Sequence, residues 1–380
     1  MNNRRVKILL ITNDFPPCFS GGISNFYFNL CKRRENNHVK IIAPFCKGSI
    51  EFDRNEKLIT KRAKVPIRRS FMGRVLQMAI LLFQSFQELR KSNYDYIWCG
   101  HIYLLPIGFM LKRIFRCKYF TICHGGETRV YGDNPIIKRF FKKIICDADI
   151  VICNSHKTFQ EISSVFGRRR NIFIVNPGVD TKYFKPLSNV EKDGVEILSV
   201  GTLVKRKNHE NVIKSLPALI ESFPRLKYVI IGEGPEKERL MKLAYEYMGL
   251  KNHVVFLGYI EDNELVKYYN KAKIFIMPSK DLEERLGTEG FGIVYLEANA
   301  CELPVIGGRA GGVEDAIIDG ETGILVDPES VVDIKDAIEK LLKEENLANS
   351  LGKKGRERVI AELDWDVVAK RFFALLVNQD

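Results

Sequence analysis

The stretch that best indicates both fold and chemistry is GTEGFGIVYLEANACELP, residues 287–304. Glycines at positions 290 and 292 leave the backbone unobstructed, and the residues from Ile293 to Ala300 read as a short helix. The first amides of such a helix have no partner within it, and they attract phosphate. The stretch therefore predicts a phosphate-binding turn between a strand and a helix.

Two carboxylates flank this turn. Glu297 lies about one helical turn beyond Ile293 and on the same face, so it is expected to reach a group attached to the phosphate, such as a ribose diol. Glu289 precedes the glycines and is expected on the other side of the phosphate, where a sugar would lie. The alternative is an ordinary helix start, with acidic residues favoured by the helix dipole.

Working outward, short apolar runs recur along the chain with helical segments between them. Runs of this length without clean alternation suit strands that are buried on both faces of parallel sheets. The predicted strands are 6–12, 39–43, 96–99, 119–123, 150–153 and 172–175 in the first half, and 195–200, 228–231, 254–257, 274–277, 304–306 and 324–326 in the second. The pattern predicts an α/β protein with two doubly wound halves.

The domain boundary is expected near residue 185. At 380 residues the chain exceeds one ordinary core. Residues 176–194 hold turn-forming residues without a period, as a linker does. The predicted domains are therefore 1–185 and 186–363.

Composition excludes several classes of protein. The nine cysteines are scattered and form no CxxC pair, which indicates a reducing cytoplasm without a disulfide framework or zinc site. The apolar part of the N-terminus is about seven residues long and reads as a first strand rather than a signal peptide. The apolar run from Val75 to Phe83 is interrupted by Gln77 and is too short to span a membrane.

Charge is divided unequally between the halves. Residues 1–185 hold 33 Lys and Arg against 13 Asp and Glu, a net of +20, whereas residues 186–380 hold 26 against 34, a net of −8. The first half is therefore expected to meet an anionic partner.

The motifs together resemble the retaining GT-B glycosyltransferases of family four. The spacing of Glu289 and Glu297 in EGFGIVYLEA carries the resemblance. Further matches are FPPCFSGGISNF, HGGE at His124, NPGVD, VGTLVKRKNHE, IGEGP, VVFLGY, FIMPS and GETGILVDP, in the expected order over essentially the whole chain. The resemblance implies two Rossmann-like domains facing across a cleft, with an acceptor-side domain first, a nucleotide-sugar donor domain second, and a last helix (364–380) that packs back on the first.

The resemblance also assigns roles to individual residues. It places the glycine loop and a lysine against the donor diphosphate, Glu297 at the ribose, Glu289 at a sugar hydroxyl, backbone amides at the sugar and phosphate, and His124 at the reaction centre. The residues assigned in this way are Gly21, Gly22, His124, Lys207, Tyr259, Glu289, Phe291, Gly292, Ile293 and Glu297, of which His124, Glu289 and Lys207 form the catalytic set. Taken alone, Lys207 would read as a solvated lysine, and His124 as a histidine satisfied at a strand end.

One position departs from the family pattern. Where the family usually has an arginine five residues before the lysine, this chain has Thr202. A hydroxyl cannot supply the charged fork with which arginine grips a diphosphate. Arg206 or Lys205, which precede Lys207, are the candidates to replace it.

The mechanism implied by the resemblance is transfer with retention, without metal or cofactor. Lys207, a nearby arginine and the helix end at Gly292 would stabilise the negative charge on the leaving nucleotide. No nucleophile is assigned. The nucleotide, UDP or GDP, is not readable, and neither is the sugar.

The acceptor is expected to be a lipid-linked saccharide in the synthesis of a surface polysaccharide, lipopolysaccharide or glycolipid. Residues 71–91 have a broad apolar face preceded by Lys61, Arg62, Lys64, Arg68 and Arg69, and KRFFKKII follows at 138–145. Apolar surface flanked by cations suits an anionic membrane surface. The chain is therefore expected to bind peripherally at the cytoplasmic face of the cell membrane, although such helices often simply bury their apolar face on the sheet.

Three other functions are less consistent with the sequence. A nucleic-acid partner is not expected, because the basic runs, including 168–170, accompany no reader motif. A nucleotide-sugar epimerase or hydrolase would share the two-domain form, but EGFGIVYLE argues against it. A nicotinamide-dependent oxidoreductase is disfavoured because no GxGxxG follows the first strand.

Overall fold

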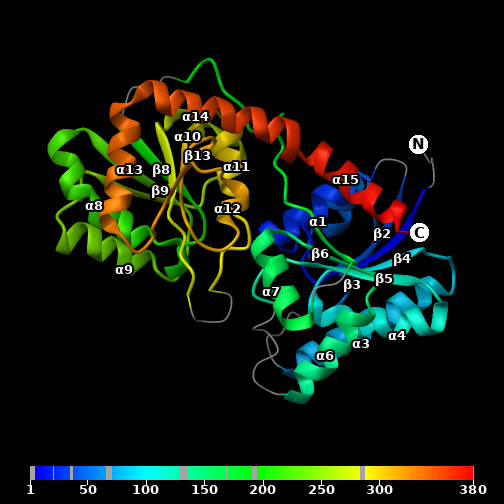
Figure 1. The fold of residues 1–380 in the computed structure, drawn as a ribbon. Helices are drawn as coiled ribbons and strands as arrows, with labels where there is room; N and C mark the ends of the chain where they lie inside the picture. Colours follow the sequence, from blue (N-terminus) through cyan, green and yellow to red (C-terminus); the bar gives the residue numbers. More distant parts are fainter. Residues whose placement is uncertain are drawn as a thin grey trace. The chain divides into compact units, whose positions relative to one another are not determined.

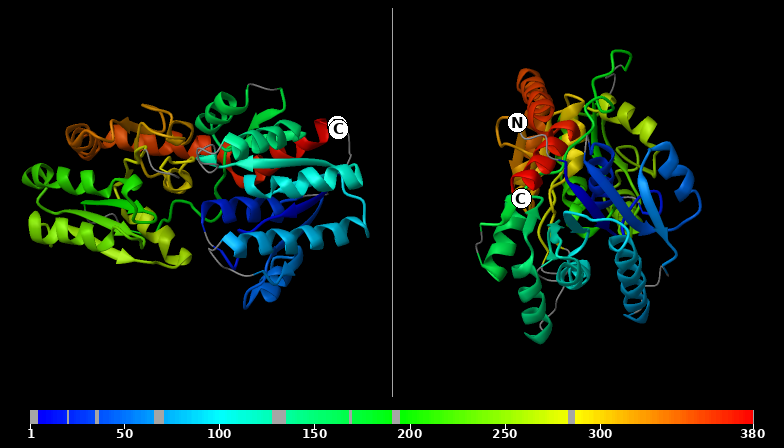
Figure 2. Two further views of the ribbon diagram at one scale, coloured as in Figure 1. Left: turned by 90° about the horizontal axis from the view of Figure 1, so that it is seen from below. Right: turned by 90° about the vertical axis from the view of Figure 1, so that its right-hand side faces the viewer.

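The computed structural model describes residues 5–19, 21–34, 37–65, 71–127, 135–167, 170–190, 195–282 and 287–379. It divides into two compact units, the first comprising Met1–Pro177 with Trp365–Asp380 and the second Gly178–Asp364. The division after Pro177 falls within the segment 176–194, somewhat before the boundary expected at 185. Each unit is a parallel sheet covered by helices on both faces (Figure 1 and Figure 2).

The first sheet has seven parallel strands in the order β3-β2-β1-β4-β5-β6-β7. Side chains alternate between two cores, with Leu9 and Ile11 on one face of β1 and Ile8 and Leu10 on the other. The strands are β1 (Lys7–Ile11), β2 (His38–Pro44), β3 (Ile59–Ala63), β4 (Tyr96–Cys99), β5 (Lys118–Cys123), β6 (Ile150–Cys153) and β7 (Ile172–Ile174).

The strand β3 is absent from the sequence prediction. It reads ITKRA, and only Ala63 in it is buried, because it forms the edge of the sheet. An edge strand lacks the continuous apolar run by which the other strands were recognised.

Helices cover both faces of this sheet. One core lies under α3 (Phe71–Leu89), α4 (Leu105–Phe115), α6 (Pro135–Asp147) and α7 (His156–Phe166), and the other lies under α1 (Gly22–Lys32) and α15 (Trp365–Asn378). The unit also contains α2 (Ser49–Asn55) and the turn η1 (Ile102–Leu104). The last helix of the chain, α15, thus packs in the first unit, where Tyr96 donates a hydrogen bond to the Leu376 carbonyl at 3.0 Å.

The second sheet has six parallel strands in the order β10-β9-β8-β11-β12-β13. They are β8 (Val195–Val200), β9 (Leu226–Ile231), β10 (Val254–Gly258), β11 (Ile274–Met277), β12 (Val305–Gly308) and β13 (Gly323–Val326). Its helical elements are η2 (Lys205–Lys207), α8 (His209–Ser222), α9 (Lys237–Lys242), η3 (Leu243–Tyr247), α10 (Asp262–Lys271), α11 (Ile293–Ala300), α12 (Val313–Ala316), α13 (Val331–Lys343), α14 (Glu345–Arg358) and η4 (Val359–Leu363).

Both sheets reverse strand order next to their first strand, at β1 and β4 and at β8 and β11. In open parallel sheets, ligands bind at the carboxyl ends of the strands near such a reversal. Among the helices of the described residues, none combines the length and apolar character needed to cross a bilayer.

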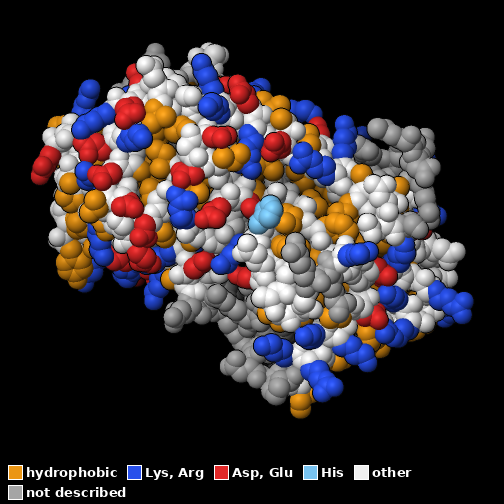
Figure 3. All heavy atoms as spheres, in the orientation of Figure 1, with side chains coloured by type: hydrophobic (Ala, Val, Ile, Leu, Met, Phe, Trp, Pro, Cys, Tyr) orange, Lys and Arg blue, Asp and Glu red, His pale blue; other side chains and the backbone are white. Residues whose placement is uncertain are grey.

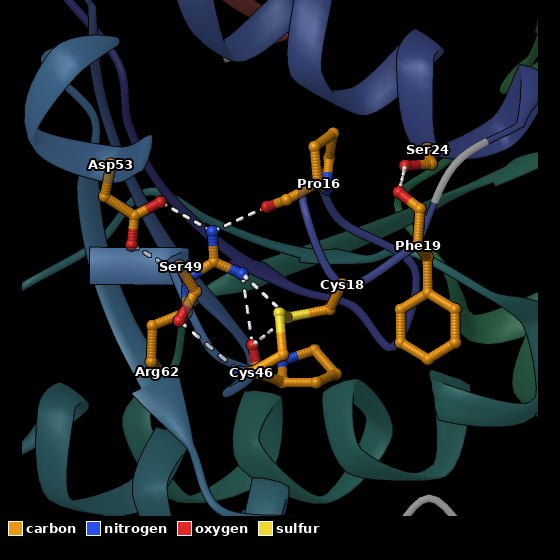
Figure 4. The surroundings of a disulfide bond; sticks show 9 residues. Pro16, Cys18, Phe19, Ser24, Cys46, Ser49, Asp53 and Arg62 are labelled. Atoms are coloured by element: carbon orange, nitrogen blue, oxygen red, sulfur yellow. Dashed lines mark hydrogen bonds and ion pairs between the residues drawn. A yellow bond between two sulfur atoms is a disulfide. The ribbon is translucent and has the colours of Figure 1, made fainter. Parts of the chain in front are cut away.

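The expectation that the cysteines form no disulfide is wrong for one pair. Cys18, after β1, is joined to Cys46, after β2, with their Cα atoms 5.6 Å apart (Figure 4). The two cysteines are 28 residues apart, and only the parallel pairing of β1 with β2 brings them together. Arg62 lies beside the bridge, where it pairs with Asp53 at 2.6 Å and donates to the Pro16 carbonyl at 2.6 Å. Cys31, Cys99, Cys117, Cys123, Cys153 and Cys301 are free thiols.

Candidate active site

Glu289 lies at the carboxyl edge of the second sheet, in the loop between β11 and α11. Its backbone carbonyl accepts a hydrogen bond from Gly312 N at 2.8 Å. Gly311 has a φ of 59°, and a side chain there would collide with the Glu289 backbone. The glycines after β12 therefore fix the position of this carboxylate.

The Glu289 carboxylate gathers three donors on one oxygen. Lys207 Nζ lies 2.7 Å from Oε2, Ser279 Oγ lies 3.3 Å from it, and Arg206 forms a close ion pair with the same atom. Glu289 and Lys207 are each 8% exposed. Two cations and one carboxylate thus share a buried site, with a net positive charge available to an anion.

This site keeps Glu289 ionised. Burial would raise the pKa of its carboxyl group, but Lys207 and Arg206 together hold that pKa below its ordinary value. A buried carboxylate of this kind is stable only while its cations remain in place.

The structure distinguishes between the two candidates for the missing arginine. Thr202 is exposed in the loop after β8. Lys205 is also exposed and lines a cavity of about 340 Å³ with Asn208 and Lys280. Arg206 is the one that joins Lys207 at Glu289.

The helix α11 begins directly after this cluster. Gly292, its N-cap, has a φ of 96°, and among the described residues no side chain caps the first amides of the helix. The Phe291 side chain is buried in a hydrophobic core of the second unit. Its backbone therefore lies at the turn, beside Ile293. The loops after β8 and β11, which are neighbouring strands, thus bring two cations and the start of α11 to one edge of the sheet, as a phosphate site requires.

Glu297 has a different environment. Tyr269, on α10, donates a hydrogen bond to Glu297 Oε2 at 2.7 Å. Burial raises the pKa of Glu297 to about 7, against the opposing effect of the tyrosine. Tyr259, directly after β10, is 70% exposed.

The residues expected in the first domain lie at the carboxyl edge of the first sheet. Gly21 is the N-cap of α1 with a φ of 142°, Gly22 is the first residue of that helix, and no side chain caps it. They belong to the first unit, whereas Arg206, Lys207, Glu289 and Glu297 belong to the second.

His124 follows β5, and hydrogen bonds hold both its backbone and its ring. Its backbone N–H and that of Gly125, at 2.8 Å, donate to the Glu127 carboxylate, which explains the HGGE sequence. Its Nε2 lies 2.9 Å from the Tyr27 hydroxyl, which itself donates to the Gly100 carbonyl. Nε2 is therefore the protonated ring nitrogen. Burial and the charge of His101 lower the pKa of His124 to about 3, so the imidazole is neutral near pH 7.

Family models cover most of the chain. Residues 181–358 match glycosyl transferases group 1, and residues 20–183 match glycosyltransferase family 4. A mannosyltransferase of Mycolicibacterium smegmatis, named as GDP-mannose-dependent alpha-(1-6)-phosphatidylinositol monomannoside mannosyltransferase, is 30% identical over 97% of this chain and 98% of its own. This chain belongs to the family 4 glycosyltransferases.

Solved structures confirm the GT-B fold of this glycosyltransferase. Sucrose-phosphate synthase from Thermosynechococcus elongatus is similar with a TM-score of 0.81 at 23% identity, covering 98% of this chain and 99% of that one. The Anabaena protein HepE, solved in complex with UDP, is similar with a TM-score of 0.81 at 17% identity, covering 98% and 100%.

The sequence reasoning missed a polar cluster of the glycosyltransferase on the first sheet. Asn13 and Asp14 follow β1, and His101 and Tyr103 follow β4. The signal was present, since Asn13 and Asp14 directly follow the predicted strand 6–12, and His101 and Tyr103 lie two and four residues after the predicted strand 96–99. None of the motifs that carry the family resemblance includes them.

Two Asp-x-Asp pairs of the chain form ion pairs and hydrogen bonds with neighbouring residues. Asp147 and Asp149, spaced as Asp-x-Asp, pair with Lys112 at 3.6 and 3.1 Å. In a second such pair, Asp364 accepts from Thr181, and Asp366 pairs with Arg33 at 2.7 Å. Within the described residues, no group of three or more His, Cys, Asp or Glu side chains is arranged for a metal. Metal independence stays a prediction.

Proposed function

We propose that this glycosyltransferase moves a hexose from a nucleotide-diphosphate sugar to a glycolipid acceptor. The observation that carries the proposal is the pairing of Arg206 and Lys207 on Glu289 beside the uncapped start of α11. The mannosyltransferase relatives of Mycolicibacterium smegmatis and Corynebacterium glutamicum are both named GDP-mannose-dependent, which supports GDP-mannose as the first donor to test.

The proposed chemistry assigns one task to each group. Arg206, Lys207 and the α11 amides would stabilise negative charge on the departing diphosphate, as preorganised donors do. Glu289 would bind a sugar hydroxyl through the oxygen that its cations leave open, and Glu297 would bind the ribose. The proposal includes retention at the anomeric carbon and independence of metal and cofactor, and it assigns no enzymatic nucleophile.

A glycolipid acceptor is supported by an exposed apolar surface on the first unit. Met72 on α3 is 74% exposed and Ile136 on α6 is 78% exposed. The surface also includes Val75, Leu76 and Phe83 on α3, Met110 and Ile114 on α4, and Ile137 and Phe140 on α6. Leu81 and Leu89 of the same helix are instead buried on the sheet. Part of α3 is thus buried on the sheet, and membrane binding by its exposed side chains belongs to this proposal.

Cations accompany this surface. Arg139, Lys142 and Lys143 line a cavity of about 690 Å³ on α6 together with Ile136 and Phe140. Lys and Arg predominate over α3, α4 and α6 in Figure 3, whereas Asp and Glu are frequent over α8, α9 and α13. Arg68 and Arg69 lie outside the described residues. We take this surface to bind anionic lipid at the inner face of the cell membrane.

Donor binding and transfer test the enzymatic part of the proposal. Thermal-shift measurements with GDP-mannose and UDP-glucose should show stabilisation by one of them, by about 2.7 kcal/mol at 100 times its dissociation constant. Radiolabelled sugar should then pass to a phosphatidylinositol mannoside. Donor consumption without acceptor, or formation of an epimerised nucleotide sugar, would instead identify a hydrolase or epimerase.

Vesicle co-sedimentation tests the membrane part. The protein should bind phosphatidylglycerol vesicles at about 50 mM salt and dissociate as salt screens the attraction. Phosphatidylcholine vesicles are the lipid control. The Met72→Asp and Phe140→Asp double variant should lose binding, while Val332→Asp, at an exposed apolar residue of the second unit, should not. Failure of the wild type to bind phosphatidylglycerol would indicate a soluble acceptor.

A further inference from the structure

The polar cluster at the ends of β1 and β4 is a second arrangement of chemically capable side chains, separate from the cations of the second unit. His101 Nε2 lies 2.8 Å from Asp14 Oδ2, and Asn13 Nδ2 donates to the Tyr103 hydroxyl at 3.1 Å. The rings of His101 and Tyr103 stack with centroids 5.0 Å apart and planes 9° apart. Two adjacent loop ends thus present a carboxylate, an amide, an imidazole and a phenol together.

Part of this cluster's hydrogen-bonding capacity is unused. Asn13 is 6% exposed, and its Oδ1 has no hydrogen-bond partner within the part of the chain that the structure describes. A buried carbonyl oxygen without a partner is costly, and native proteins rarely leave one without a role. The Asp14 side chain remains 33% exposed, so solvent-side lone pairs stay accessible as well.

The cluster also adjoins His124. The Tyr27 ring packs edge-on against both His101, at 6.2 Å, and His124, at 5.5 Å. Asp14 and His124 are close enough for each to influence the pKa of the other. Since β1, β4 and β5 are neighbours in the sheet, these residues share one edge of the first unit.

We propose that Asn13, Asp14, His101 and Tyr103 bind hydroxyl groups on the ring of the acceptor, a sugar or cyclitol. The inference rests on the proposed function, in which the first domain receives the acceptor. Asn13 Oδ1 and the Asp14 carboxylate are hydrogen-bond acceptors and match the O–H donors of a vicinal diol. The Tyr103 hydroxyl and the His101 ring lie close by and can donate hydrogen bonds, which complements these acceptors.

The same chemistry argues against an anionic group in this position. The pKa of Asp14 would be raised by burial, but the hydrogen bond from His101 and the charge of His101 lower it, so the carboxylate is ionised near neutral pH. A phosphodiester carries only acceptor oxygens, so it can form no hydrogen bond with Asn13 Oδ1 or with the Asp14 carboxylate. The cluster therefore recognises the neutral ring of the acceptor rather than its phosphodiester.

Steady-state kinetics with Asn13→Ala, Asp14→Asn and His101→Gln test the assignment. Each lost charged or buried hydrogen bond should raise the acceptor KM about 10- to 100-fold. The dissociation constant for GDP, measured by calorimetry, should stay within about twofold, because the nucleotide contacts are assigned elsewhere. Glu88→Gln is the matched control, since it removes another buried carboxylate of this unit, paired with Lys40 at 2.8 Å. An unchanged acceptor KM in folded Asp14→Asn and Asn13→Ala proteins would overturn the inference.

Direct binding separates failure of this site from failure of the proposed function. Methyl α-mannoside and myo-inositol should give saturation-transfer NMR signals with the wild-type protein that weaken in Asp14→Asn and persist in Glu88→Gln. This readout requires no turnover and no nucleotide. Signals that are absent from the wild type, or equal in all three proteins, would reject the site even if transfer is observed. Ring binding without transfer would retain the site and reject the proposed reaction.

Discussion

Glu289 and Glu297 belong to one motif, yet the surroundings of the two carboxylates are opposite. Glu289 shares its oxygen with two cations and a hydroxyl, which lower its pKa. Glu297 has the neutral Tyr269 hydroxyl as its partner, and burial raises its pKa to about 7. Sequence spacing treats the two residues as a pair, whereas the fold gives them different electrostatic roles.

The difference fits the proposal that one short segment binds two ends of a donor. Glu289 acts as counter-ion to the cations that would meet the diphosphate, so its charge is needed even before a ligand arrives. Glu297 is poised between its two protonation states near neutral pH, as suits a group that hydrogen-bonds an uncharged diol. The following variants test this contrast.

The largest effect is expected for Glu289→Gln. Loss of the sugar contact should lower kcat by at least about 100-fold, as for removal of one transition-state partner. Affinity for GDP or UDP should be kept or increased, because Arg206 and Lys207 are released from their counter-ion. Calorimetry and kinetics on the same protein measure both quantities. Weaker nucleotide binding would contradict the counter-ion role.

Arg206→Ala should weaken nucleotide diphosphate binding by about 1.5 to 3 kcal/mol, the usual value for a hydrogen bond to a charged group. Lys205→Ala is the control and should change it by less than about 0.5 kcal/mol, since that side chain is exposed. Adding Thr202→Arg to Arg206→Ala restores the arginine at the position usual in the family. Recovery of affinity would show that Arg206 replaces the missing arginine. An equal loss of affinity in Lys205→Ala would show that the effect of Arg206→Ala is not specific to that side chain.

Much of the fold was predictable, because strand burial leaves a local signal. Twelve of the thirteen strands found in the described residues, and the family assignment, follow from apolar runs and motif order. The missing strand, β3, pairs at the edge and carries Lys61 and Arg62, so its sequence reads as polar. The disulfide between Cys18 and Cys46 was missed because it depends on which strands are neighbours.

The site was predictable in its members but not in its contacts. The motif named Glu289 and Lys207, but their ion pair spans 82 residues of sequence, and local patterns contain no information on it. The bond between Asn13 and Tyr103 spans 90 residues and belongs to no motif. Such pairings arise only when parallel strands bring their carboxyl ends to one edge of a sheet.

Glu297→Gln should weaken nucleotide binding by about 1 to 3 kcal/mol if the ribose assignment is right. The glutamine keeps an oxygen that can accept the hydrogen bond from Tyr269, but it cannot present a charged oxygen to the ribose diol. Calorimetric titration with GDP and with pyrophosphate distinguishes the site of the loss. The variant should bind GDP more weakly and pyrophosphate as well as the wild type does. A parallel loss for pyrophosphate would place Glu297 at the phosphates instead.

The smallest effect concerns stability without ligand and follows from the raised pKa of Glu297. Its folded-state value of about 7 exceeds the ordinary 4.5, so the folded protein holds a proton that the unfolded chain releases between these values. The stabilisation that this proton gives is complete below the ordinary value and is lost as pH rises through about 7. Glu297→Gln remains neutral, so its unfolding midpoint should exceed that of the wild type at about pH 8, by a few degrees, and the advantage should shrink at about pH 5. Scanning calorimetry at both pH values measures this difference, with Glu302→Gln, a solvent-accessible glutamate near the end of α11, as the control. An equal difference at the two pH values would mean that Glu297 is not the titrating group, and the contrast with Glu289 would then rest on geometry alone.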